Sequence, residues 1–375
     1  MYASIIVGVL VSLKISSLVL VPLPWFVLVH LSKKHFITGT FFKKFSILIK
    51  FLFIALLEVF IVLSLFLLLN PFAVLDFKAF VSSIQYESSV GTGALPVFYT
   101  GSFYNTTPIW YQITHVFPYL LNPVNYLLII FSFLFLLITT FKEKNIKFFF
   151  LLIFIFFLLI PQAILFVKWT RYMIPTLPFL YILLAYSLYN LYLFSKKQNK
   201  KILNIYKVSV YCVVIISTFY ATLFIKTVYG KPDTRIQAAT YASRNLPSTS
   251  KILSETYDLG IIPFNSYFET ITLFDFYDLD NDIQKKEELK TVLNNHDYFI
   301  IISQRVQKSR LQNPDHFPEG HAFYSKVTQN KNFDLVYSTP CDIWCKIIYI
   351  GDPVYRIEDT ANVFDRPQVS IYKIK

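Results

Sequence analysis

Long apolar blocks alternate with short polar gaps through roughly the first 225 residues of the chain. A bilayer-spanning helix needs roughly 20 predominantly apolar residues. Blocks of that kind predict spanning helices at residues 47–69, 124–140, 148–167, 173–194 and 208–225. The first block, residues 2–31, is longer than one span needs and has Lys14 near its middle. We therefore expect two short helical pieces that meet near Lys14, or one kinked helix.

Two charged side chains lie inside these apolar blocks. Glu58 lies within the predicted span 47–69. A carboxylate facing lipid is costly, so we expect Glu58 to face the interior of the helix bundle. Lys14 has two interpretations. It can be a functional intramembrane group, or it can extend its ammonium from a helix break to one membrane surface, and the pattern favours the second.

After about residue 226 the apolar runs shrink to strand length and charged residues become common. The pattern predicts helices at residues 234–246, 282–294 and 320–329, and strands at 251–254, 297–302, 333–337, 345–349 and 369–374. Alternating strands and helices indicate a small α/β domain. The predicted fold class is a polytopic α-helical membrane domain at residues 1–226, followed by a small α/β domain at residues 227–375.

The distribution of basic residues predicts which side of the membrane each loop faces, because cytoplasmic loops are enriched in Lys and Arg. The basic clusters are Lys33 with Lys34, Lys43 with Lys44, Lys142 with Lys144 and Lys147, and Lys196, Lys197, Lys200 and Lys201. The stretch at about 70–123 has Lys78 as its only Lys or Arg. We therefore expect an outer loop at about 70–123, a multi-pass protein of the cell membrane, and an extracytoplasmic α/β domain.

The composition agrees with a membrane protein and excludes two other classes. Hydrophobic residues make up 55% of the chain and the mean hydropathy is +0.50, which is too apolar for a soluble protein of this size. The formal charge of +12 is divided among short clusters between apolar blocks. That distribution is typical of topology signals and not of a basic stripe that binds nucleic acid.

A short polar gap at residues 168–172 separates two predicted spans on the outer side. Because the gap is short, Lys168 and Arg171 must lie at the depth of the lipid headgroups, with Tyr172 beside them. Two cations and a phenol can hold a lipid phosphate by charge-assisted hydrogen bonds. They can also anchor helix ends at the interface, and position alone favours this anchoring.

The outer loop contains a second group of candidates. Thr106 or Thr107 can cap a helix that begins at Pro108. Trp110 and Tyr111, followed by two further aromatic residues at 117 and 119, suit a helix lying along the membrane interface. The same residues are also typical of an aromatic belt without chemistry, so both interpretations stay open.

The acidic cluster at residues 278–282 and the cysteines each have two interpretations. Alternate carboxylates can share a hard cation, but this cluster precedes a predicted helix, which favours helix capping. Cys341 and Cys345 can form a disulfide in an oxidising compartment, although two separate buried thiols are somewhat favoured. The histidines are scattered without ligand spacing, so no metal site is predicted.

The motif Arg171-Tyr172-x-x-Pro175-x-x-Pro178, at the outer start of a late span, resembles the RYxxPxxP helix of bacterial integral-membrane glycosyltransferases. That family is like glycosyltransferase family 39, has the GT-C fold, and is related to protein O-mannosyltransferases and aminoarabinose transferases. Further segments resemble it in matching order: Lys14, residues 70–76, residues 99–111 and residues 364–372. The resemblance covers most of the chain and implies a partial GT-C-like membrane domain.

The resemblance implies transfer of a sugar, as by a hexosyltransferase, from a polyprenyl-phosphate donor to an acceptor on the outer face of the membrane. The candidates for the lipid phosphate are Lys168, Arg171 and Tyr172. The candidates for outer-loop contacts with substrate are Asp76, Thr107, Trp110 and Tyr111. The expected partners are the polyprenyl-phosphate sugar and membrane lipids, and not nucleic acid. No cofactor is predicted, although the need for a divalent metal stays open.

One feature of that family has no counterpart in this pattern. The family's catalytic aspartate lies in the first outer loop, and no position here matches it, so the catalytic residue stays unassigned. We expect the chain to be the carboxyl-terminal part of a longer transferase, either inactive alone or completed by a separately encoded amino-terminal half. The alternative is a non-catalytic membrane protein whose outer α/β domain binds a glycan or a protein partner.

Overall fold

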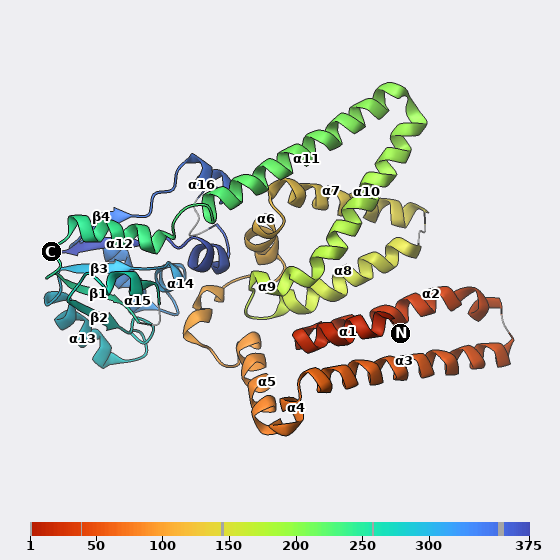
Figure 1. Cartoon of the computed structure of the whole chain (residues 1–375), viewed down its shortest axis with the longest axis horizontal. Helices are drawn as coiled ribbons and strands as arrows, with labels where there is room; N and C mark the ends of the chain where they lie inside the picture. The colour runs from red at the N-terminus through yellow and green to blue at the C-terminus, as the bar shows by residue number, and fades with distance from the viewer. Residues whose placement is uncertain (1, 39, 144–145, 257–258, 352–355) are drawn as a thin grey trace. The chain divides into compact units, whose positions relative to one another are not determined.

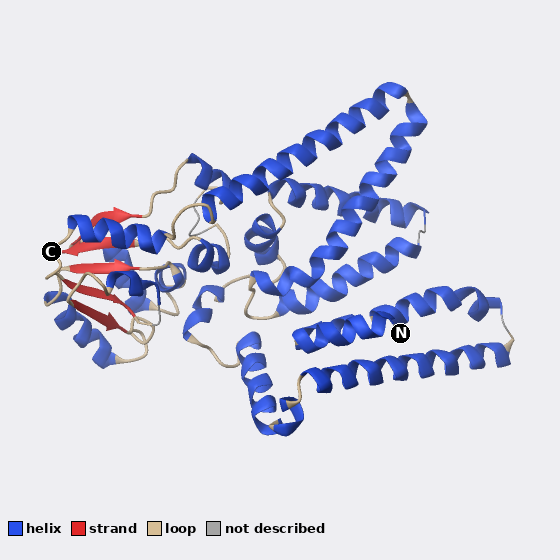
Figure 2. Ribbon diagram, viewed as in Figure 1, coloured by secondary structure: helices blue, strands red, loops and turns tan. Residues whose placement is uncertain are grey.

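The computed structural model describes residues 2–38, 40–143, 146–256, 259–351 and 356–375. The first part of the chain is helical, and a five-stranded sheet with its helices forms in the last part (Figure 1; Figure 2). Lys144, which was predicted to lie in a cytoplasmic turn, is outside the described residues.

Helices account for the apolar blocks. They are α1 (Tyr2–Leu13), α2 (Leu23–Thr38), α3 (Phe41–Leu69), α4 (Phe72–Leu75), α5 (Phe77–Thr92), α6 (Phe117–Leu120), α7 (Pro123–Glu143), α8 (Ile146–Ile164), α9 (Thr170–Met173), α10 (Leu177–Gln198) and α11 (Lys200–Val228). The described helical stretches long and apolar enough to cross a membrane are Phe41–Leu69, Thr170–Gln198 and Lys200–Val228. The predicted spans at 124–140 and 148–167 fall on α7 and α8, whose described apolar parts are shorter.

Contacts between residues divide the chain into two compact units. Unit 1 consists of Met1–Ser89, Ser132–Gln162 and Ile174–Ser187. Unit 2 consists of Val90–Phe131, Ala163–Met173 and Leu188–Lys375. Unit 2 therefore combines the sheet with three segments of the predicted membrane domain, including the 168–172 gap.

In unit 1 the first apolar block is interrupted as predicted. Helix α1 ends at Leu13, Lys14 is extended (φ −153°, ψ 113°), and a 3₁₀ turn follows at Ile15–Leu20. Helix α1 packs on α3 through a small apolar cluster made by Val7, Val11 and Val62. Glu58 of α3 is only 2% exposed, which confirms that it faces the protein interior.

The predicted outer loop at 70–123 is largely helical, because it contains α4, α5 and α6 together with the 3₁₀ helix Phe98–Phe103 and a π-helical turn. The helix predicted to begin at Pro108 starts later, since Pro108 lies in a turn and a π-helical turn spans Gln112–Val116. Thr106 does not cap this turn: its hydroxyl donates to the carbonyl of Phe103 at 2.6 Å. Tyr111 is 6% exposed, so the prediction of an aromatic face along a membrane interface is wrong for this residue.

The sheet of unit 2 has the order β2-β1-β3-β5-β4. Its strands are β1 (Lys251–Glu255), β2 (Thr270–Phe274), β3 (Tyr298–Ile301), β4 (Phe333–Ser338) and β5 (Ser370–Ile374). β1 pairs in parallel with β2 and β3, whereas β5 is antiparallel to β3 and β4. The accompanying helices are α12 (Thr234–Asn245), α13 (Ile283–Asn294), α14 (Arg305–Gln312), α15 (Pro318–Thr328) and α16 (Ile343–Ile348).

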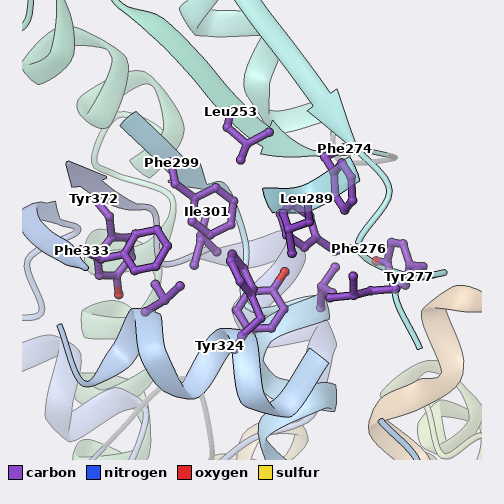
Figure 3. Packing of buried hydrophobic residues seen from close by; sticks show 14 residues of the cluster. Leu253, Phe274, Phe276, Tyr277, Leu289, Phe299, Ile301, Tyr324, Phe333 and Tyr372 are labelled. Carbon is purple, nitrogen blue, oxygen red and sulfur yellow. The ribbon is translucent and has the colours of Figure 1, made fainter. Parts of the chain in front are cut away.

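Both faces of the sheet are covered, which explains the unbroken apolar run of its central strand. Successive side chains of a strand point to opposite faces. Phe299 and Ile301 pack in one cluster with α13 and α15 residues (Figure 3). Ile300 and Ile302 pack in the other cluster, with residues of α12. The α/β architecture predicted for this region is therefore confirmed, with helices on both faces of the sheet.

One predicted strand is wrong. Residues 345–349 lie in and just after helix α16, whose first turn is capped by Asp342, which accepts a hydrogen bond from the Cys345 N–H at 2.9 Å. A short apolar run does not by itself distinguish strand from buried helix. Cys341 and Cys345 form a disulfide across this turn, which corrects the preference for two separate thiols.

The acidic cluster at 278–282 serves helix capping, as predicted. Asp282 accepts a hydrogen bond from the Gln284 N–H at 2.8 Å and so caps α13. Asp280 accepts from the Glu319 N–H at 2.7 Å, at the start of α15. The two carboxylates thus hold two helices on the same face of the sheet.

Candidate functional site

Unit 2 contains a cavity of about 350 Å³ beside helix α14. Its lining side chains are mostly hydroxyl, amide and aromatic groups, namely Ser102, Tyr104, Asn105, Thr106, Thr107, Trp110, Tyr111, His115, Lys308, Gln312 and Asn313. They come from three places: the 3₁₀ helix Phe98–Phe103 with the segment after it, the π-helical turn Gln112–Val116, and α14 with the residue directly after it. Small-molecule sites span about 300–1,000 Å³, so the cavity can take a ligand of modest size.

A buried ion pair supports one wall of the cavity. The ammonium of Lys308 lies 3.2 Å from Oδ1 of Asp359 and donates to the carbonyl of Ile357 at 3.0 Å. The hydroxyl of Ser102 donates to Oδ2 of Asp359 at 2.8 Å. All three side chains are at least nine-tenths buried. Through Asp359 the pair also joins the 3₁₀ helix Phe98–Phe103 to α14.

The neighbouring carboxylate, Glu358, reaches the segment that the sequence motif singled out. Its Oε2 accepts from the main-chain N–H of Thr170 at 3.2 Å and from the Thr170 hydroxyl at 2.6 Å. Its own N–H donates to the carbonyl of His115 at 3.2 Å. The acidic pair Glu358-Asp359 therefore connects the outer-loop candidates with the Lys168–Tyr172 segment.

The acidic pair is itself held by packing. Ile357 and Ala361 are fully buried in a cluster with Val228, at the end of α11, and with Tyr349, just after α16. A π-helical turn, Thr360–Asp365, follows directly. We did not predict a role for Glu358 or Asp359 because the sequence places them far from the outer loop and outside any recognised motif.

Trp169 is the centre of an aromatic group in the predicted phosphate site. Its ring lies 6.0 Å from Tyr99, 6.1 Å from Phe103 and 5.5 Å from Tyr172, measured between centroids. The guanidinium of Arg171 lies 4.2 Å from the Trp169 centroid, within the range of a cation–π contact. Arg171 is exposed, so a flat, charged donor is presented on an aromatic support.

Lys168 is placed differently from Arg171. It is only 3% exposed, and its Nζ donates to the carbonyl of Phe166 at 3.0 Å. Burial lowers the pKa of this ammonium from its ordinary value. Of the three candidates for a lipid phosphate, Arg171 and Tyr172 therefore lie together, with the guanidinium 5.7 Å from the tyrosine ring, whereas Lys168 is an interior group.

Three of the predicted outer-loop contacts meet at the cavity. Thr107, Trp110 and Tyr111 all line it. Trp110 is 63% exposed and offers its ring, whereas Tyr111 is buried and stacks on His115 with centroids 4.6 Å apart. Burial, followed by the negative charges of the Glu358-Asp359 pair, holds the pKa of Tyr111 well above its usual range. Tyr111 therefore remains a neutral hydrogen-bonding group.

Asp76, the fourth predicted contact, belongs to unit 1. Its Oδ1 accepts a hydrogen bond from the Ala79 N–H at 3.2 Å, in the first turn of α5. The geometry that the structure describes for Asp76 is that of a helix cap.

Within the described residues, no group of His, Cys, Asp and Glu side chains has the arrangement of a metal site. The cavity of unit 2 can instead bind a polar ligand by hydrogen bonds and ring stacking, and Arg171 can bind an anion. Comparisons of the chain with protein-family models, with curated proteins and with solved structures found no match.

Proposed function

We propose that this chain is a membrane glycosyltransferase of the GT-C type that moves a hexose from a polyprenyl phosphate to an acceptor hydroxyl on the outer face of a membrane. The observation that carries the proposal is the polar and aromatic cavity of unit 2, linked through Glu358 to the Lys168–Tyr172 segment. In this proposal the cavity takes the sugar and acceptor, and Arg171 takes the lipid phosphate.

The lining of the cavity supports a carbohydrate ligand. Sugars present hydroxyl groups around a ring whose C–H face is apolar, so they need hydrogen-bonding side chains and one open aromatic face. Asn105, Thr107 and Gln312 supply the first, and the exposed ring of Trp110 supplies the second. The lining has few charged groups, which favours a neutral sugar.

The position of Arg171 supports a lipid-linked donor. Arg171 lies in the first turn of the helical stretch Thr170–Gln198, which is long and apolar enough to cross a membrane. A cation at the end of such a stretch lies near headgroup depth, where a lipid phosphate also lies. A guanidinium can bind that phosphate in a bidentate manner.

The test uses the full chain purified in lipid nanodiscs that contain no glycoside detergent. Polyprenyl phosphate that carries a radiolabelled hexose is added. Loss of the label from this lipid is measured, because transfer to any acceptor, including water, removes the hexose and releases free polyprenyl phosphate. Trp110→Ala should lower transfer roughly twofold to tenfold, which corresponds to a stacking contribution of about 0.5–1.5 kcal/mol. Trp344→Ala is the matched control, since Trp344 is an exposed tryptophan on α16.

A second candidate function uses the same cavity without chemistry: a membrane protein that binds a glycan. It is favoured by the fact that no carboxylate is among the described residues that line the cavity. Binding of the hexose lipid without any release of polyprenyl phosphate would select this function and exclude the transferase.

A further inference from the structure

His115 lies on the cavity wall in the π-helical turn Gln112–Val116. Its ring is parallel to that of Tyr111, with an interplanar angle of 1° and centroids 4.6 Å apart. Because Tyr111 is buried, this stacking restricts the plane of the imidazole. The ring is therefore oriented before any ligand binds.

The hydrogen bonds around His115 define its tautomer. The hydroxyl of Thr114 has one hydrogen, and it donates this hydrogen to the carbonyl of Trp110 at 2.8 Å. The 2.6 Å contact between Thr114 Oγ1 and His115 Nδ1 then requires Nδ1–H to be the donor. In the neutral ring the lone pair is consequently on Nε2.

The surroundings favour the neutral ring. Burial, and next the positive charge of Lys308, lower the pKa of His115 from its ordinary value, and Arg356 acts in the same direction. A hydrogen bond between the ring and the Tyr111 backbone raises this pKa; its effect is smaller than that of Lys308 and larger than that of Arg356. The nearby acids do not compete well as bases: Asp359 accepts hydrogen bonds at both oxygens, and Glu358 Oε2 accepts two from Thr170.

We propose that His115 is the general base of this site, with Nε2 accepting the proton of the acceptor hydroxyl. This inference rests on the proposed function. The acceptor oxygen forms a bond to the anomeric carbon of the hexose, and the bond from that carbon to the phosphate oxygen breaks. The electron pair of the broken bond goes to the polyprenyl phosphate, and the acceptor proton goes to Nε2, from which it later passes to water.

Thr114 is a positioning residue in this proposal. It accepts the Nδ1 hydrogen and thereby keeps the lone pair on Nε2. Thr114→Val keeps the shape of the side chain and removes the acceptor, so both tautomers become available and the base is partly lost. A loss of activity in this variant would therefore come from the loss of a defined His115 tautomer, because the packing around the ring is kept.

The first experiment needs no turnover. Diethyl pyrocarbonate modifies unprotonated imidazole nitrogens, and the modified peptide is quantified by mass spectrometry of the full chain in nanodiscs. His115 should react, and methyl α-mannoside or methyl α-glucoside should slow its reaction at least threefold. His296, whose two ring nitrogens are both hydrogen bonded at 2.6 and 2.7 Å, is the slow internal reference. Reaction that neither glycoside slows would overturn the placement of sugar against Nε2.

The second experiment measures transfer against pH. His115→Gln should lower kcat by about 100-fold or more with little change in KM for the lipid donor. Wild-type kcat/KM should fall on the acid side as His115 becomes protonated, below the ordinary histidine pKa, and the variant should lose this limb. If the wild type is active and His115→Gln has the same rate and pH profile, His115 is not the general base, and the proposed transferase is unaffected. An inactive wild type would overturn both the base and sugar transfer by this chain on its own.

Discussion

Glu358 accepts two hydrogen bonds from Thr170 although 188 residues separate them in the chain. The shorter of the two, from the Thr170 hydroxyl, is 2.6 Å long, and the carboxylate is fully buried. This contact ties the segment that carries Arg171 to the segment that carries Asp359. The candidate site is therefore assembled by tertiary structure, and its integrity depends on a few buried polar contacts.

Replacing Thr170 with Val should destabilise unit 2 without changing the shape of the side chain. The change removes one of the two donors to a buried carboxylate, and an under-satisfied buried acceptor costs about 1–3 kcal/mol. Thermal unfolding of the chain in nanodiscs measures the loss. Thr222→Val is the control, because the Thr222 hydroxyl donates only to the Thr218 carbonyl on the same exposed helix. Equal melting temperatures for the two variants would contradict the role of the Glu358 contact.

Replacing Lys308 with Met should be more damaging. The change leaves the buried carboxylate of Asp359 without its ammonium partner, and breaking a buried ion pair in this way costs about 3–5 kcal/mol. Adding Asp359→Asn to Lys308→Met removes the unpaired charge and should recover part of the stability. Lys290→Met breaks an exposed pair with Glu287 and should have almost no effect. No recovery in the double variant would show that packing, and not charge, dominates.

The hydrophobic periodicity of the sequence was sufficient to predict most of the helices and strands. β3 was predictable because an apolar run bounded by polar residues fits a strand buried on both faces. α13 was predictable because Asp282 begins it as a cap. Helix α16 was not predictable, because the apolar side chains of the run at 345–349 suit either a strand or a short helix. The disulfide was not predictable either, because a Cys-x-x-x-Cys spacing does not by itself indicate a disulfide.

The candidate site was only partly predictable, for a related reason. Arg171 and Trp110 could be selected from residue type and position alone. Glu358 and Asp359 could not, because their importance comes from Thr170, Ser102 and contacts distant in sequence. The different environments of Lys168 and Arg171 likewise depend on packing, which a spacing of three residues does not reveal.

The disulfide gives a test of the compartment. If the chain is isolated from cells with its thiols blocked at once, denatured protein should show one reactive cysteine, Cys212, before reduction and three after it. Disulfides persist in oxidising compartments, so this result would support an extracytoplasmic location of the turn around α16. Cys341→Ser is the control and should expose one additional thiol without reduction. Three reactive cysteines in the unreduced wild type would contradict the outer location.

Arg171 gives the sharpest test of the lipid-phosphate site. Replacing it with Gln keeps a polar side chain and removes the charge, and a hydrogen bond to a charged group contributes about 1.5–3 kcal/mol. We therefore expect Arg171→Gln to weaken binding of polyprenyl phosphate roughly 10-fold to 100-fold, measured by displacement of a fluorescent lipid phosphate from the chain in nanodiscs. Arg244→Gln is the matched control, because Arg244 is an exposed arginine on α12. If both variants bind the lipid as tightly as the wild type, Arg171 serves only to anchor a helix end at the membrane surface, and the phosphate site must be sought elsewhere in unit 2.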